Sequence, residues 1–320
     1  MHFVTDAIII AFLVADGILV IDFIRNGLTG PMGKFSWGLV LFFLAALTCW
    51  ILVFYGSFIE PRFITIKRET VQLNENPAQT MRAVLISDTH FGPYKQTGFA
   101  QKIAERVSTL NPDVIFLLGD FIYDDESDVQ YLSPFKNLKA SLGVFAILGN
   151  HDYGNGRGYK DCGAKGEARA KKVHETLEGL GIKVLVNAGQ KITFEGKDIF
   201  ILGVDDLWTK RADIASAIQT FGQAKTPRPS ILIAHNPDSV KTAEKLGIDL
   251  VLSGHTHGGQ IRLPFWGPVP PLPDTLGRKY DKGLFRFDKT QLYITSGVGE
   301  IGARARLFDP PEIVLMKIKF

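Results

Sequence analysis

The chain has 320 residues, of which 46% are hydrophobic and 22% charged, and its formal net charge is +3. This near balance, without a run of Lys and Arg, gives no support to nucleic acid as a partner. The two cysteines, Cys49 and Cys162, are too few for a disulfide framework and have no CxxC spacing. The composition therefore indicates a globular protein with an apolar attachment.

The apolar residues are concentrated in two segments near the N-terminus, residues 3–24 and 37–59. Each has about the 20 residues that a helix needs to cross a bilayer. The intervening residues 25–36 hold Gly, Pro and Asn, which turn the chain. We therefore predict a transmembrane helical hairpin over residues 1–59. Two buried core helices are the alternative, and a cleaved signal peptide fits less well because the first residues lack a basic region.

Three aspartates interrupt the first segment, and Asp16 falls near its middle, where an ionised carboxylate is costly. We expect Asp16 to be neutral, paired in an oligomer or facing the second helix, unless the segment lies shallow in the bilayer. Basic residues near the helix ends are slightly more numerous on the side of the large C-terminal region. This asymmetry slightly favours a cytoplasmic location for that region.

Residues 60–80 form a mixed stretch that we interpret as a linker with a lead-in strand. From residue 81 to residue 320, short runs rich in Val, Ile and Leu alternate with amphipathic stretches, which is typical of strands buried on both faces and joined by helices. The fold class is therefore α/β, in a layered domain large enough for a substantial core. Helices are expected at 96–110, 166–181 and 239–246. Strands are expected at 82–87, 113–119, 144–149, 182–187, 198–204, 230–235, 249–254 and 291–297.

Polar side chains that can bind a metal follow five of these runs, in VLISDTH, IFLLGD, AILGNHD, LIAH and VLSGHTHGG. Open α/β sheets bind ligands at the carboxyl ends of their strands, so we expect these side chains to share one site. They are Asp88, His90, Asp120, Asn150, His151, Asp152, His235, His255 and His257.

The spacing of these residues suits a pair of metal ions. In extended backbone, residues i and i+2 point the same way, so Asp88 and His90 are expected to face one site, as are His255 and His257. Mixed nitrogen and oxygen ligands favour manganese, iron, zinc, cobalt or nickel over calcium, and a thiolate cluster is excluded. Without His151 and Asp152, the nine side chains make a set of seven ligands. Seven ligands suit two ions about 3.5–4 Å apart that share a carboxylate.

The motifs DTH, GD, GNHD, AH and GHTH, in this order, resemble those of the calcineurin-like metallophosphoesterase superfamily. The segments GHTHGGQIRLP and TSGVGEIGARARLFDPPEIVLM are similar to its bacterial membrane-associated branch. The resemblance implies a calcineurin-like layered β-sandwich flanked by helices over residues 81–320. It also implies two bound divalent ions, for which manganese is expected ahead of iron, zinc, cobalt or nickel. It implies that the first ion is held by Asp88, His90, Asp120 and His257, and the second by Asp120, Asn150, His235 and His255.

The resemblance also implies a mechanism. A hydroxide between the ions would attack phosphorus in line, His151 would donate a proton, and Asp152 would orient the His151 ring. Arg304 and Arg306 could clamp a phosphate by paired donors.

The resulting hypothesis is a membrane-anchored phosphoester hydrolase with the lipid bilayer as partner. It would be a multi-pass protein of the bacterial inner membrane, acting on a phosphorylated, lipid-linked substrate such as UDP-diacylglucosamine. The alternatives are a general phosphodiesterase for soluble substrates and a non-catalytic metal-binding membrane scaffold. An amidohydrolase barrel is disfavoured because the eight-fold strand–helix alternation is missing.

Overall fold

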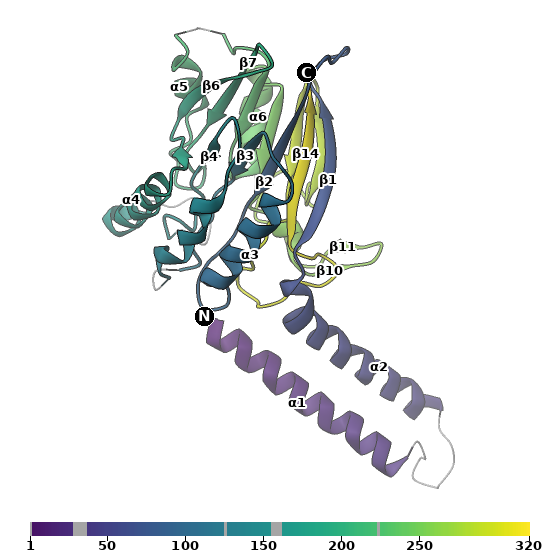
Figure 1. Cartoon of the computed structure of the whole chain (residues 1–320). Coiled ribbons are helices and arrows are strands. Elements are labelled where there is room, and N and C mark those ends of the chain that lie inside the picture. The colour runs from purple at the N-terminus through teal and green to yellow at the C-terminus, as the bar shows by residue number, and fades with distance from the viewer. Residues whose placement is uncertain (1, 28–36, 125–126, 155–161, 223–224) are drawn as a thin grey trace.

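Two apolar helices lead into a layered α/β domain (Figure 1). α1 (His2–Asn26) and α2 (Trp37–Phe54) lie side by side, and Nε1 of Trp50 donates a hydrogen bond to the Leu13 carbonyl at 3.0 Å. Both are long and apolar enough to cross a membrane, and most of their side chains are exposed. The turn expected between them falls largely outside the described residues. The computed structural model describes residues 2–27, 37–124, 127–154, 162–222 and 225–320.

Asp16 lies where α1 packs against α2. Its side chain is 8% exposed, and Ala46 is the buried residue of α2. The neighbouring Gly17 abuts the Trp50 ring, since a Cβ built on Gly17 would lie 3.3 Å from Nε1 of Trp50. Of the arrangements that the sequence leaves open, the structure has the one in which this carboxyl faces the second helix. The helix pair therefore keeps the Asp16 carboxyl, the group least favourable in hydrocarbon, away from its outer surface.

α2 continues into the domain through two short helical turns, η1 (Tyr55–Ile59) and η2 (Glu60–Arg62). The Glu60 carboxylate is buried and accepts hydrogen bonds from the backbone N–H groups of Phe308 and Asp309. The segment expected to be a linker with a lead-in strand then supplies an edge strand of the first sheet. No free tether therefore separates α2 from the domain.

Two six-stranded sheets form the domain. Four neighbouring strands of each sheet run parallel, so their carboxyl ends meet at one edge. The first sheet has the order β1 (Thr65–Gln72), β14 (Glu312–Lys319), β2 (Thr80–Ile86), β3 (Val114–Leu117), β4 (Val144–Ala146) and β5 (Lys183–Val184). The second has the order β12 (Gly283–Phe287), β13 (Thr290–Ile294), β9 (Leu250–Ser253), β8 (Ser230–Ile233), β7 (Lys197–Gly203) and β6 (Ala188–Phe194). A separate hairpin joins β10 (Arg262–Leu263) and β11 (Gly267–Pro268).

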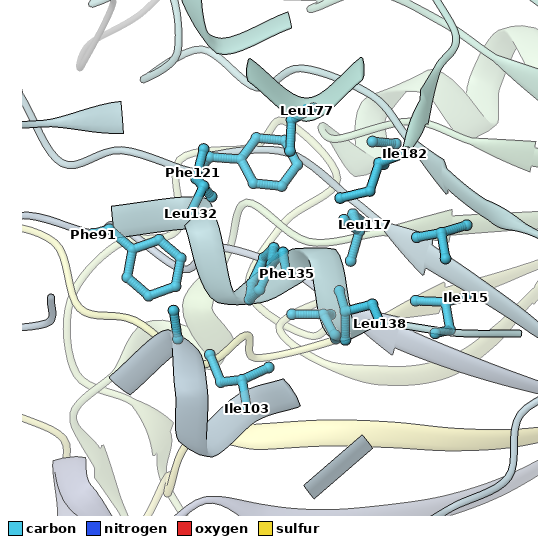
Figure 2. Close-up of a cluster of buried hydrophobic side chains, with 14 of the residues drawn as sticks. Phe91, Ile103, Ile115, Leu117, Phe121, Leu132, Phe135, Leu138, Leu177 and Ile182 are labelled. Carbon is cyan, nitrogen blue, oxygen red and sulfur yellow. The ribbon is translucent and has the colours of Figure 1, made fainter. Parts of the chain in front are cut away.

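Alternate residues of each inner strand enter different cores, as expected for strands buried on both faces. In β3, Ile115 points to the helices that cover the first sheet, and Phe116 points to the second sheet. Figure 2 shows the first of these cores, where Phe135 packs among side chains of α3, α4 and the sheet. A third core lies between the second sheet and its helices. The helices are α3 (Thr97–Ser108), η3 (Val129–Asn137), α4 (Gly163–Gly179), α5 (Ile214–Gln219), η4 (Pro237–Ser239), α6 (Val240–Lys245) and η5 (His257–Gly259).

These layers confirm the predicted fold class, and each of the eight predicted apolar runs contains a strand. The three helices predicted in the domain are α3, α4 and α6, each within a few residues of the expected bounds. β6, β10, β11, β12 and β14 were not predicted. β6 and β12 are edge strands whose residues are mostly part-exposed, so their composition is more mixed than that of an inner strand.

Candidate metal centre

The predicted site residues gather at one edge of the two sheets, each in the loop that follows a parallel strand. Asp88 and His90 follow β2, Asp120 follows β3 and Asn150 follows β4. From the second sheet, His235 follows β8, and His255 and His257 follow β9. All seven side chains are at most 5% exposed. The fold therefore brings together residues that lie up to 169 positions apart in the sequence.

Asp88, His90 and His257 form a first cluster with ligand atoms that all lie within 4.8 Å of one another. The Nε2 atoms of His90 and His257 are 3.1 Å apart, and Asp88 Oδ1 is 3.4 Å from Nε2 of His257. The backbone N–H of His255 donates to the Asp88 carboxylate, which fixes its orientation. These atoms surround a space that one cation would fill.

Asp120, His235 and His255 form a second cluster of the same size. Nε2 of His235 is 3.2 Å from Asp120 Oδ2 and 3.2 Å from Nδ1 of His255. Asp120 Oδ2 is also 3.5 Å from Nε2 of His90 in the first cluster. Asp120 is therefore placed to share its carboxylate between the two clusters.

Asn150 and His151 lie beside the second cluster, in the wall of a cavity of about 350 Å³. Asp120, His255 and His257 line the same cavity. The His151 ring stands edge-on to His90, with centroids 4.8 Å apart, and its backbone N–H donates to Asp120 Oδ1. Burial lowers the pKa of His151 below its usual value, although the nearby Asp120 opposes this. The cavity thus gives a ligand access to both clusters and to one further imidazole.

The backbone at these residues is not the extended one that the sequence analysis assumed. Asp88, His90, Asp120, His255 and His257 have φ between 42° and 71°, in the left-handed region that non-glycine residues rarely adopt. Their side chains converge because tight left-handed turns end the strands, and not because residues i and i+2 share a strand face. Such conformations are disfavoured by about 1–3 kcal/mol each and cluster at functional sites.

Two glycines of the motifs make room for the carboxylates. A Cβ built on Gly254 would lie 2.3 Å from Asp88 Oδ2, and one built on Gly149 would lie 2.3 Å from Asp120 Oδ1. Both distances are far below van der Waals contact, so a side chain at either position would displace a carboxylate. Gly149 and Gly254 are therefore required because only a residue without a side chain leaves room for the neighbouring carboxylate.

Asp152 has a different set of partners from the one expected. Its carboxylate accepts hydrogen bonds from the backbone N–H groups of Asp120 (3.0 Å), Phe121 (2.8 Å) and Gly149 (2.9 Å). These bonds join the loop after β3 to the loop after β4, and no described contact joins this carboxylate to the His151 ring. Asp152 thus holds the backbone that carries Asp120, Asn150 and His151.

Arg306 is fully buried and does not face the cavity as a phosphate clamp. Its guanidinium donates to the backbone carbonyls of Ser296, Gly299 and Asp309. These bonds fold residues 296–309, the C-terminal loop, whose middle part lines the cavity. Arg304 lies 3.9 Å from Asp6 of α1 in an ion pair. Neither arginine has the predicted role of a phosphate clamp, because Arg306 is bonded to backbone carbonyls and Arg304 is paired with a carboxylate of α1.

Trp208 belongs to the site and was missed. Its ring stands edge-on to His255, with centroids 4.4 Å apart, and it lines the cavity. It follows β7, which ends at the same sheet edge. A search of every strand end for aromatic residues, as well as for metal ligands, would have found it.

The charge state of the clusters fits divalent cations. Burial lowers the pKa of His90, His255 and His257 well below the ordinary value, so these rings are neutral at pH 7. Each ring also keeps one buried nitrogen that has no hydrogen-bond partner among the described residues. Neutral imidazoles beside carboxylates are the form that binds a divalent metal.

His235 is held by a second contact, and the neighbouring carboxylates raise its pKa. Its Nδ1 atom hydrogen-bonds the Leu118 carbonyl at 2.7 Å, which leaves Nε2 facing Asp120. Burial lowers the pKa of His235, but Asp120 and Asp88 outweigh burial and raise it to about 10. The two carboxylates thus favour positive charge at this position, which is the charge that a bound cation would bring.

Comparison with known proteins agrees with this geometry. The family model of calcineurin-like phosphoesterases matches residues 81–259, more than half of the chain. An uncharacterized metallophosphoesterase of Campylobacter jejuni is 31% identical over 255 residues, and the match covers 76% of this chain and 60% of that protein. The phosphodiesterase YaeI of Escherichia coli is 29% identical over 82% of this chain and 92% of its own length. The UDP-2,3-diacylglucosamine pyrophosphatase LpxG of Chlamydia muridarum is 29% identical, with coverage of 85% and 94%.

Proteins of this family use a dinuclear divalent metal centre, and the two clusters of carboxylates and histidines supply side chains for one. The sequence motifs and the placement of their residues thus agree with the family match. We conclude that the chain belongs to the calcineurin-like phosphoesterase family and is a metal-dependent phosphoester hydrolase.

Proposed function

We propose that this hydrolase is anchored in a membrane by α1 and α2 and acts on a lipid-linked phosphate or diphosphate. One observation carries the proposal: the catalytic cavity and the two apolar helices are joined by the C-terminal loop. Arg306 in this loop donates its backbone N–H to the Gly56 carbonyl in η1, the turn that follows α2, and Ile301 and Ala303 of the same loop line the cavity.

The cavity wall suits a substrate with an apolar part. Besides Asn150 and His151, it is lined by Ile261, Ile301 and prolines 270, 271 and 273. An apolar wall beside a polar cluster matches a molecule that carries its phosphate next to hydrocarbon. The name of the Chlamydia relative describes such a substrate, a nucleotide diphosphate joined to a diacylated sugar.

We further propose that two manganese ions occupy the two clusters. Asp88, His90 and His257 would hold the first ion, His235, His255 and Asn150 the second, and Asp120 would bridge them. When bound, such ions lower the pKa of water and neutralise charge on phosphoryl oxygens.

The side chains of the cavity would do the remaining work. Asp120 would fix the spacing of the two clusters, while Asp152 holds the backbone beneath them. His151 would hold a proton within reach of the phosphoryl group or the leaving oxygen. Residues 81–320, together with the edge strand β1, would form the catalytic unit, placed on the cytoplasmic face of the bacterial inner membrane.

The test uses the full chain in detergent with Mn²⁺ and two substrates. One is a diacylated sugar nucleotide diphosphate, read by mass spectrometry of the released products. The other is bis(p-nitrophenyl) phosphate, a soluble phosphodiester. We expect a higher kcat/KM for the lipid, and loss of both activities in Asp120→Asn. A kcat/KM that is equal or higher for the soluble ester would favour a general phosphodiesterase, in line with the name of the Escherichia coli relative.

A further inference from the structure

The β10–β11 hairpin is attached to the point where α2 enters the domain. The backbone N–H of Arg306 donates to the Gly56 carbonyl, and that of Arg262 donates to the Leu307 carbonyl, both at 2.9 Å. Ile261 and Leu307 form an isolated parallel bridge. Figure 1 accordingly shows the hairpin beside the domain end of α2. The hairpin therefore lies at the level where the proposed membrane helix would leave the bilayer.

The tip of this hairpin is apolar and exposed. Phe265 is fully exposed, and Trp266 is 68% exposed. Among the described residues after position 60, eight large apolar side chains are exposed, and six of them lie on the hairpin or next to the α2 junction. These six are Phe63, Leu263, Phe265, Trp266, Val269 and Phe308. Large apolar side chains gathered in one exposed area mark an interaction surface.

Basic side chains surround the tip. The Arg278 guanidinium lies over the Trp266 ring, 5.2 Å from its centroid, and donates to the Trp266 carbonyl. Lys279 borders the same depression, as does Arg262, whose guanidinium is paired with Asp281. Aromatic residues flanked by Arg and Lys are typical of the boundary between hydrocarbon and phosphate headgroups.

We propose that the β10–β11 hairpin inserts Phe265 and Trp266 into the bilayer surface as a second membrane contact. This inference rests on the proposed membrane anchoring by α1 and α2. A bilayer fits better than a protein partner because the exposed aromatic tip continues the apolar surface of α2 at the same level and carries cations for lipid phosphate.

The base of the hairpin reaches the catalytic cavity. Ile261 and Pro270, at its two ends, line the cavity, and Gly259 touches Pro268 so closely that a Cβ on Gly259 would lie 2.3 Å from Cβ of Pro268. The same element thus has its tip at the proposed bilayer surface and its base beside the metal clusters. Insertion of the tip would turn the apolar wall of the cavity towards the lipid.

Tryptophan fluorescence of the full chain in nanodiscs tests the insertion. The chain has four tryptophans, so the signal of Trp266 is obtained as the difference between the wild type and Trp266→Phe. We expect this difference signal to be quenched when the phosphatidylcholine is brominated in its acyl chains. The matched control is Trp208→Phe, whose difference signal reports a cavity residue and should not be quenched. An unquenched Trp266 signal overturns the proposal.

Activity then tests the consequence for the substrate. A Phe265→Ser, Trp266→Ser variant should lose roughly tenfold in kcat/KM for the diacylated substrate in nanodiscs, and keep its activity on bis(p-nitrophenyl) phosphate. The control is Val186, an exposed apolar residue that follows β5, the edge strand of the first sheet farthest from β1. Val186→Ser should change neither activity. Equal losses on both substrates would make the tip a support of the metal clusters and overturn its role towards lipid.

The two proposals fail in different ways. If no lipid-linked substrate is hydrolysed, the proposed function is wrong, but the quenching of Trp266 still decides whether the hairpin enters the bilayer. If the lipid is hydrolysed while Trp266 remains unquenched, the proposed function stands and the hairpin contact is wrong.

Discussion

The metal clusters depend on individual residues, and only some of their roles could be predicted from the sequence. The carboxylates and histidines were predictable because their residue types stand at the ends of apolar runs, and the fold does bring them together. The partners of Asp152 and Arg306 were not predictable. Asp152 and Arg306 form their hydrogen bonds with backbone groups, within their own loop or in the loop after β3, and the sequence has no pattern that indicates such contacts.

At the residue scale, Gly254→Ala should weaken metal binding in the first cluster. The new methyl group would lie 2.0 Å from Ser87 Oγ and 2.3 Å from Asp88 Oδ2, so both side chains would have to move. We expect at least one ion per chain to be lost after dialysis, measured by inductively coupled plasma mass spectrometry. Gly98→Ala is the matched control, since a Cβ there meets no atom within 4 Å. Full metal content in Gly254→Ala would contradict this account of the glycine.

His151→Ala should separate metal binding from turnover. The His151 side chain lies beside the clusters but its ring is not part of either, so both ions should remain. Loss of a proton donor should lower kcat by about 10²–10⁴-fold. His174→Ala, on α4, is the control and should leave kcat unchanged. A variant of His151 with unchanged kcat would remove the residue from the proposed chemistry.

At the element scale, the inner strands were easier to predict than the strands at the sheet edges. Inner strands are buried on both faces and read as continuous apolar runs, whereas β6 and β12 carry part-exposed residues among apolar ones. β1 was expected only as a lead-in strand, because its partner β14 lies more than 240 residues away in the sequence. Long-range pairing of this kind has no local signal.

An ion pair joins the loop before α3 to the C-terminal loop. Lys95 Nζ lies 2.6 Å from Glu300 Oε1, and both side chains are buried. Lys95→Met or Glu300→Gln should each lower the free energy of unfolding by about 3–5 kcal/mol, because the remaining partner stays buried without its pair. The double substitution Lys95→Met, Glu300→Met should recover most of this loss in urea unfolding. The exposed pair Lys191–Asp198 is the control, and Lys191→Ala should cost less than about 1 kcal/mol.

The same lysine predicts a pH dependence. Burial lowers the pKa of Lys95 to about 8 from 10.5, although Glu300 opposes this. Between pH 8 and 10.5 the unfolded chain therefore binds more protons at Lys95 than the folded one, so this residue makes stability rise with pH. Relative to Lys95→Met, the wild type should gain stability across this window in urea titrations. A difference that stays constant from pH 7.5 to 10 would contradict the pKa.

At the scale of the whole molecule, the boundary between the helices and the domain is set by Glu60 and not by the end of the apolar segment. A chain that starts at residue 55 keeps Glu60 and its hydrogen bonds to Phe308 and Asp309, whereas one that starts at residue 64 loses them. We expect both to be soluble, with the shorter chain lower in Tm by about 6–12 °C in differential scanning calorimetry. Equal Tm values would show that the junction is not part of the domain.

Metal removal should also lower the stability of the whole domain. Ions that bind only the folded chain stabilise it by about 2.7 kcal/mol at a concentration of 100 Kd. Exhaustive chelation should therefore lower Tm by about 5–10 °C, with recovery when Mn²⁺ is added back. The Asp120→Asn variant should show a much smaller shift. A wild-type Tm that is insensitive to chelation would argue against ions in the buried clusters.

The direct attachment of the C-terminal loop to the end of α2 has a geometric consequence. If α1 and α2 cross the bilayer as proposed, the clusters stand at a constant height above the headgroups, because Gly56 and Glu60 are hydrogen-bonded to the same loop that lines the cavity. An enzyme fixed in this way would be selective for the distance between phosphorus and the bilayer surface. On the proposed function, it would reach phosphorus only at one depth, so the length of the headgroup, and not its chemistry alone, would decide which lipids are cleaved.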